Sequence, residues 1–228
     1  MKLPKEEELY PMVERWVKRH FRCFKTATNR GLAYSRMDVV GVRDIGGDLS
    51  GDVETIVVEV KRRTRTFATA CGQTLGYKVY ANRVYLAIFR KEPYTPEELA
   101  IASHLGIGLV RIWGNRCHEV LSSPYYDPMP RLGLSVMEKL RLCKCQLCGC
   151  FFEIGDVSGN RWANLARQGV SKALRDEKGI LFWNMEVANR KKSLGLRQAP
   201  DGTSFERRFI CPDCVYSFFS EFVEEPDQ

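Results

Sequence analysis

Apolar residues in the first half of the chain recur with two different periods. From Glu6 to His20 they lie three and four residues apart, which predicts an amphipathic helix. Two further helices are expected, over Thr69–Ala81 and Pro96–Leu105. Runs rich in Val and Ile predict strands, namely Leu32–Val42, Val53–Lys61, Arg83–Phe89 and Ile107–Trp113. A helix, a strand hairpin and then alternating helices and strands indicate an α/β fold, a mixed sheet flanked by helices.

The periodic pattern stops between Ser122 and Pro130, where three prolines occur. We therefore place a domain boundary there and predict a first domain over residues 1–120. Residues 121–142 form a linker with a short helix over Leu134–Leu142. Residues 143–228 form a second module, into which a helix over Arg161–Arg175 and the basic run Arg190–Lys192 are inserted.

Composition and charge narrow the class of protein. The apolar and charged fractions are those of an ordinary globular protein. A net charge of +7 favours an anionic partner, of which nucleic acid is the commonest. The first residues are charged and lack the apolar core of a signal peptide. No apolar run approaches the roughly 20 residues that span a bilayer, so we expect a cytoplasmic protein with no membrane partner.

The strand expected over Val53–Lys61 carries the most informative polar residues. Side chains alternate between the two faces of a strand, so Glu59 and Lys61 share one face, about 7 Å apart. Ile56, Val58 and Val60 occupy the other face and point into a core. Asp38 lies in the preceding apolar strand. A hairpin between the two strands brings its carboxylate beside that of Glu59.

Two carboxylates and a nearby backbone carbonyl are hard oxygen ligands suited to Mg²⁺ or Mn²⁺, which bind phosphate oxygens at their open positions. Such a cation polarises the phosphate and lowers the pKa of a bound water. Lys61 is placed to orient that water or to neutralise charge on the phosphorane. Asp38, Glu59 and Lys61 thus predict hydrolysis of phosphodiester bonds. Their plainer interpretation is a solvated strand face with a weak surface ion pair.

These residues resemble the PD-(D/E)xK nuclease superfamily, which has the restriction-endonuclease-like fold. The matching segments are Glu8-Leu-Tyr-Pro, Arg36-Met-Asp38-Val-Val, Val58-Glu59-Val-Lys61, Gln73 in the next helix and the strand Arg83-Val-Tyr-Leu-Ala. The resemblance spans roughly residues 5 to 113 and is closest to the Holliday-junction-resolvase and Mrr-like branches. It implies metal ligation by Glu8, Asp38 and Glu59, a catalytic Lys61 and a supporting Gln73. Glu6, Glu7 and Glu14 are neighbouring alternatives to Glu8.

The resemblance implies a Mg²⁺-dependent DNA endonuclease acting on double-stranded or branched DNA in repair, recombination or defence against foreign DNA. It also allows a homodimer, since nucleases of this type often pair to cut both strands. The basic residues after Lys61 are candidates for contact with a phosphate backbone. Two alternatives stay open: activity on RNA, and a catalytically silent nuclease fold that serves as a nucleic-acid-binding or scaffold protein.

Six of the nine cysteines lie in two short clusters near the C-terminal end. Cys145-x-x-Cys148-Gly and Cys211-x-x-Cys214 have the spacing of zinc knuckles, in which both thiolates reach one ion at about 2.3 Å. Four thiolates complete a closed, structural Zn²⁺ site, so we predict a zinc-ribbon module. Gly149 can supply the positive φ that the turn after Cys148 needs. Replacement of one ligand by Cys143 or Cys150 stays open.

Overall fold

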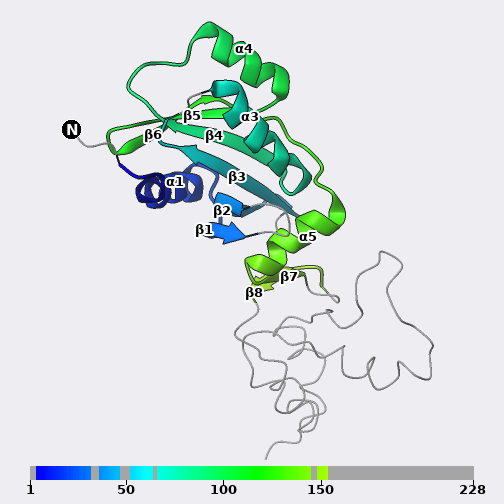
Figure 1. The fold of residues 1–228 in the computed structure, drawn as a ribbon. Coiled ribbons are helices and arrows are strands. Elements are labelled where there is room, and N and C mark those ends of the chain that lie inside the picture. Colours follow the sequence, from blue (N-terminus) through cyan, green and yellow to red (C-terminus); the bar gives the residue numbers. More distant parts are fainter. Residues whose placement is uncertain (1–3, 32–35, 47–51, 64–65, 145–147, 154–228) are drawn as a thin grey trace, which may run out of the picture. The chain divides into compact units, whose positions relative to one another are not determined.

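Six strands form one mixed sheet in the computed structural model, which describes residues 4–31, 36–46, 52–63, 66–144 and 148–153 of the chain. The strands lie side by side in chain order (Figure 1): β1 (Lys25–Gly31), β2 (Arg36–Asp44), β3 (Val53–Lys61), β4 (Arg83–Phe89), β5 (Gly108–Trp113) and β6 (Arg116–Leu121). β1 to β3 form an antiparallel meander, β3 to β5 run parallel, and β6 is again antiparallel. This architecture confirms the predicted α/β class with a mixed sheet.

Helices cover both faces of this sheet (Figure 1). The described helical segments are α1 (Glu6–His20), α3 (Phe67–Leu75), the 3₁₀ turn η1 (Gly76–Val79), α4 (Pro96–Leu105) and α5 (Pro130–Lys139), of which α1, α3 and α4 lie on the sheet. On one face, α1 packs its buried Leu9, Val13 and Val17 onto a cluster that includes Val58 and Val60. On the other face, α3 contacts β3 and β4, while α4 contacts β5. β3 is therefore buried on both faces along most of its length.

Several elements have the boundaries that the apolar pattern predicts, among them α1, β3, β4 and α4. At the start of α4 the Thr95 hydroxyl accepts from the Glu98 N–H, and the Glu98 carboxylate accepts from the Thr95 N–H. Gly106 ends α4 with φ at +63°, a conformation that glycine adopts without steric cost. The helix expected over Thr69–Ala81 instead starts and ends earlier and continues as η1.

Two strands, β1 and β6, were not expected from the sequence, and both are edges of the sheet. β1 shows little alternation of apolar and polar residues, because most of its residues are polar and only Ala27 is buried. In β6 every other residue is exposed. The edge formed by β6 is joined to α1 through His20, whose Nε2 lies 2.7 Å from Glu119 Oε2. Stacking of Trp16 on His20 adds to this contact, which gives His20 a structural partner.

The segment 122–129, expected to be a linker, is fastened to the sheet. The Ser123 hydroxyl accepts from the Val84 N–H at 3.1 Å. Asn82 and Tyr126 bond to each other through backbone and amide groups, and the Met129 N–H donates to the Val79 carbonyl at 3.0 Å. Prolines exclude helix here, but they leave these other donors and acceptors free to bond. Residues 52–140 accordingly belong with 1–47 in one compact unit.

A second compact unit comprises residues 48–51 and 141–228. Its described part is a small antiparallel hairpin of β7 (Leu142–Lys144) and β8 (Phe151–Glu153). Residues 145–150 connect the two strands, and Gly149 has the expected positive φ, at +76°. The helix predicted over Arg161–Arg175 lies outside the described residues. In the part of the chain that the structure describes, no helix is long and apolar enough to cross a membrane.

Candidate active site

β2 and β3 bring Asp38 and Glu59 together at one end of the sheet. The antiparallel register pairs Val39 with Val58. Asp38 and Glu59 are the next residues along the two strands, and the charge of Glu59 acts on Asp38. The pairing of the two strands therefore supplies the juxtaposition that the sequence pattern predicted for the two carboxylates.

Asp38 is held by two hydrogen bonds from different elements. The Tyr10 hydroxyl of α1 donates to Oδ1 at 2.8 Å, and the Val60 N–H of β3 donates to Oδ2 at 2.8 Å. Burial and then the negative charge of Glu59 raise the pKa of Asp38 to about 6, against the opposing effects of these hydrogen bonds and of Lys61. The Asp38 carboxyl group consequently titrates near neutral pH.

Glu59 is 5% exposed and has two partners. Lys61 Nζ lies 2.6 Å from Oε1, and the Tyr77 hydroxyl lies 2.7 Å from Oε2. Burial lowers the pKa of Lys61, but the hydrogen bond and the charge of Glu59 outweigh it and raise that pKa. The lysine is therefore a charged ammonium group beside two carboxylates. The face that carries Glu59 and Lys61 is largely covered, in contrast to the solvated face of the plainer interpretation.

The acids of α1 are arranged differently from one another. The exposed Glu8 accepts a hydrogen bond from the Lys5 N–H at 3.0 Å, which closes the first turn of the helix. Glu6 instead accepts at 3.3 Å from the N–H of Arg62, the residue after β3, and its charge contributes to the raised pKa values of Lys61 and Tyr10. The structure thus brings Glu6, rather than Glu8, to the edge of the carboxylate cluster.

Gln73 stands apart from the cluster. It lies on α3 with an exposed side chain. Within the described ranges, its side chain forms no hydrogen bond to Asp38, Glu59 or Lys61. Tyr77, one turn further along the chain, reaches Glu59 from the same side of the sheet.

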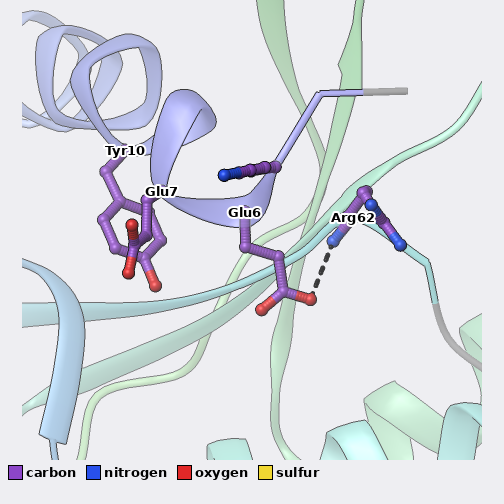
Figure 2. Close-up of a pocket in the computed structure, with 5 residues that line it drawn as sticks. Glu6, Glu7, Tyr10 and Arg62 are labelled. Carbon is purple, nitrogen blue, oxygen red and sulfur yellow. Dashed lines mark hydrogen bonds between the residues drawn. The ribbon is translucent and has the colours of Figure 1, made fainter. Parts of the chain in front are cut away.

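A pocket of about 400 Å³ opens beside the cluster. Figure 2 shows the residues that line it, with the Glu6 carboxylate turned toward the backbone of Arg62. Tyr10 belongs to both the pocket and the cluster, because its hydroxyl reaches Asp38. The pocket mixes cationic and anionic side chains contributed by the start of α1 and the end of β3: Lys5, Glu6, Glu7, Tyr10 and Arg62.

The donor set of Asp38 and Glu59 fits a hard divalent cation such as Mg²⁺ or Mn²⁺. Mg²⁺ is commonly bound through one or two carboxylates, with water and substrate phosphate as its other ligands. A cation between the carboxylates would offset the mutual repulsion that helps to raise the pKa of Asp38. No three His, Cys, Asp or Glu side chains of the described residues are grouped as a larger ligand set.

Another buried acid on β3 shows what a structural carboxylate looks like in this fold. Glu54 is 1% exposed and bonds through one oxygen to Arg43 of β2 and through the other to Arg83 of β4. Two guanidinium groups therefore neutralise one carboxylate, and these ion pairs connect β3 to the strands on either side of it. At the other end of the strand, the Lys61 ammonium pairs with Glu59, and only its charge acts on Asp38. This imbalance of charge distinguishes the candidate active site.

The proposed zinc ligands are only partly within the described residues. Cys148 lies in the connection between β7 and β8 and is exposed. Cys145, Cys211 and Cys214 lie outside the described residues, so the Zn²⁺ site stays a prediction. The described local structure here is the hairpin of β7 and β8, with a positive φ at Gly149.

Sequence reasoning missed the two tyrosines that bond to the carboxylates. Tyr10 adjoins the Glu8 that the pattern singled out, and a position one helical turn after Glu6 places it on the same side of α1. Tyr77 had no such signal, because it lies in a 3₁₀ turn within a segment predicted to be regular helix.

Comparison with known proteins leaves the family open. No family model matches the chain, and no curated protein matches it. A structure of a protein of unknown function from Silicibacter pomeroyi is similar, with 21% sequence identity and a TM-score of 0.45. The match covers 61% of this chain and 86% of that chain.

Proposed function

We propose that this chain is a Mg²⁺-dependent DNA endonuclease in which Asp38, Glu59 and Lys61 carry the hydrolysis of phosphodiester bonds. One observation carries the proposal: two carboxylates repel each other in a largely covered site beside a single ammonium group. Burial and mutual repulsion disfavour ionisation of this pair, and a bound divalent cation would offset both effects. Perturbed acids of this kind cluster at functional sites.

Asp38 and Glu59 are the residues that would hold the cation. When bound, Mg²⁺ supplies charge stabilisation at the phosphate and a water of lowered pKa. The Tyr10 and Val60 donors fix the orientation of Asp38, and Lys61 places its ammonium group at the same edge. In this role the Lys61 ammonium orients the attacking water or neutralises charge that develops on the phosphate oxygens.

DNA is the substrate that the charge distribution favours. Arg62 and Arg63 are exposed directly after Lys61 on β3, where they would contact phosphates on either side of the scissile bond. The net charge of +7 has the same sign. The resemblance to PD-(D/E)xK nucleases supports double-stranded or branched DNA as the substrate and repair, recombination or defence against foreign DNA as the setting. Pairing of two copies would allow both strands to be cut.

The test is cleavage of supercoiled plasmid, single-stranded DNA, four-way junctions and a matched RNA in Mg²⁺. We expect Lys61→Ala and Asp38→Asn to lower the rate by about 100-fold or more, since each removes a group acting on developing charge. Lys91→Ala and Asp44→Asn are matched controls, because both residues are exposed and outside the cluster. The controls should cut DNA at the wild-type rate.

Equal rates for wild type and the two site variants would overturn the nuclease proposal. Preferential cleavage of the RNA would support phosphodiester hydrolysis at this site and identify RNA, in place of DNA, as the substrate. Cleavage in EDTA at the wild-type rate would remove the cation from the mechanism.

A second candidate is a nucleic-acid-binding or scaffold protein without catalysis. One feature favours it: all four carboxylate oxygens already have donors from the protein, namely Tyr10, Val60, Lys61 and Tyr77. A site satisfied in this way is stable without a cation. Two results together would identify this second function. Wild type would bind DNA without cleaving it, and Arg62→Ala would weaken that binding.

A further inference from the structure

Two tyrosines from different elements bond to the carboxylate pair. Tyr10 comes from α1 and donates to Asp38 Oδ1 at 2.8 Å. Tyr77 comes from η1, is 4% exposed, and its hydroxyl lies 2.7 Å from Glu59 Oε2. Each carboxylate thus has a phenol bonded to it, Tyr10 for Asp38 and Tyr77 for Glu59.

Hydroxyl donors of this kind fix the direction in which a carboxylate presents its remaining lone pairs. Each carboxylate oxygen has about two acceptor positions, so an oxygen bonded to a tyrosine retains one for a cation. Two free carboxylates that repel each other would otherwise rotate apart. Groups that orient metal ligands through hydrogen bonds contribute substantially to metal affinity.

Tyr77 is also bonded to the backbone of the strand that carries Asp38. Its hydroxyl lies 2.6 Å from the Arg36 carbonyl oxygen. A phenol has one proton, and both Glu59 and this carbonyl are acceptors, so only one of them receives it at any time. The two contacts place the Tyr77 hydroxyl between Glu59 of β3 and the backbone of β2.

On these contacts we propose that Tyr10 and Tyr77 are positioning residues, which hold Asp38 and Glu59 in the orientation that binds one divalent cation. The inference rests on the proposed function, because it assigns the cation to the same two carboxylates. The tyrosines themselves touch neither cation nor substrate in this role. A purely structural role for the hydroxyls would instead leave cation affinity unchanged.

The experiment is calorimetric titration of Mn²⁺ into the purified 228-residue chain, with Asp38→Asn as the blank. We expect Tyr10→Phe and Tyr77→Phe to weaken Mn²⁺ binding by about 10-fold or more, as loss of a ligand-orienting group does. Tyr85→Phe is the matched control, because it removes another buried phenol bonded to a carboxylate, that of Glu119 at 2.8 Å. Its Mn²⁺ affinity should stay within about twofold of wild type.

A second measurement separates affinity from folding. Mn²⁺ should raise the thermal unfolding midpoint of wild type and Tyr85→Phe by the same amount, and that of the two site variants by less. Each variant is compared with and without Mn²⁺, so a lower stability of the metal-free variant does not obscure the shift in its unfolding midpoint. If Tyr77→Phe fails to fold, the half-buried Tyr10 carries the test.

The outcomes separate this inference from the proposed function. If wild type and both tyrosine variants bind Mn²⁺ equally tightly, the positioning role is overturned and the nuclease proposal stands. Wild type that binds no Mn²⁺ overturns the tyrosine roles and the cation site together. In cleavage assays, a higher Mg²⁺ requirement with an unchanged rate at saturation supports positioning, and a lower saturated rate with an unchanged requirement contradicts it.

Discussion

Asp38 is a residue whose charge the folded chain disfavours. Burial and the neighbouring Glu59 act against ionisation, while the Val60 N–H, the Tyr10 hydroxyl and Lys61 act in its favour. The first two effects prevail, so the folded state binds this proton more tightly than the unfolded state does. Linkage then requires that ionisation of Asp38 lowers the free energy of unfolding.

The sign of this effect gives a pH prediction. Between the ordinary pKa of 3.8 and the raised pKa of about 6, the folded state keeps a proton that the unfolded state has lost, so stability falls as pH rises. At pH 8 in Mg²⁺-free buffer, we expect the free energy of unfolding of Asp38→Asn to exceed that of wild type by about 1 to 2 kcal/mol. This range allows for one hydrogen bond that the amide nitrogen cannot accept.

Urea denaturation at several pH values measures this difference, which should shrink toward pH 4. Added Mg²⁺ should stabilise wild type and leave Asp38→Asn unchanged. A variant that is less stable than wild type at pH 8 without Mg²⁺ would contradict the prediction.

Strand alternation was sufficient to predict which face of β3 carries Glu59 and Lys61, because the period of two depends only on the extended backbone. The approach of Asp38 followed from the expected hairpin. The contacts of Tyr10 and Tyr77 were beyond local reasoning, since they join residues 28 and 18 positions apart in the chain. The choice between Glu6 and Glu8 depended on a helix cap, which uses one acid and leaves the other for the site.

At the scale of elements, the position of Tyr10 depends on how closely α1 packs against β2. A Cβ atom at Gly41 would lie 2.6 Å from Val17 Cγ1 and 2.7 Å from Cys23 Sγ. The missing side chain at this point of β2 therefore lets the helix approach the strand. Since Tyr10 lies two turns before Val17 on the same helix, this packing also sets its distance from Asp38.

We expect Gly41→Ala to lower the free energy of unfolding by about 1 to 3 kcal/mol, as overpacking of a core does. Gly31→Ala is the matched control on the neighbouring strand, because nothing lies within 4 Å of a Cβ there. Its effect should stay within about 0.5 kcal/mol. Urea denaturation of both variants makes the comparison, and equal stability would show that α1 shifts at no cost.

The elements predicted well and poorly differ in burial. β3 and β4 are covered on both faces, and most of their residues are apolar. β1 and β6 have one neighbour each, so their exposed positions accept polar residues and the apolar signal is lost. The segment 122–129 was missed for a different reason, because its hydrogen bonds to Asn82, Val84 and Val79 involve no periodic pattern.

At the scale of the whole molecule, the two compact units have different sources of stability. The first buries a large apolar core on both faces of a six-stranded sheet. The described part of the second is a hairpin of two three-residue strands. Isolated hairpins are marginally stable in water. A structural metal ion is a common solution for small modules of this kind.

Metal analysis of the purified chain should therefore find about one Zn²⁺ per chain. Cys211→Ser should release it, because three thiolates bind Zn²⁺ much less tightly than four. Cys117→Ser is the control, since this half-buried cysteine lies on β6 in the first unit. Substituting Cys143 or Cys150 identifies which cysteine of the first cluster is dispensable. Folded, zinc-free protein would refute the prediction.

The segment 122–129 gives residues far from the carboxylates an influence on them. Its Met129 N–H bonds to Val79, the last residue of η1, and the Tyr126 ring lies beneath the ammonium group of Lys78. Tyr77 immediately precedes these two residues and reaches Glu59. Cleavage or truncation between residues 122 and 129 would therefore loosen the support of Tyr77 while leaving every strand of the sheet intact.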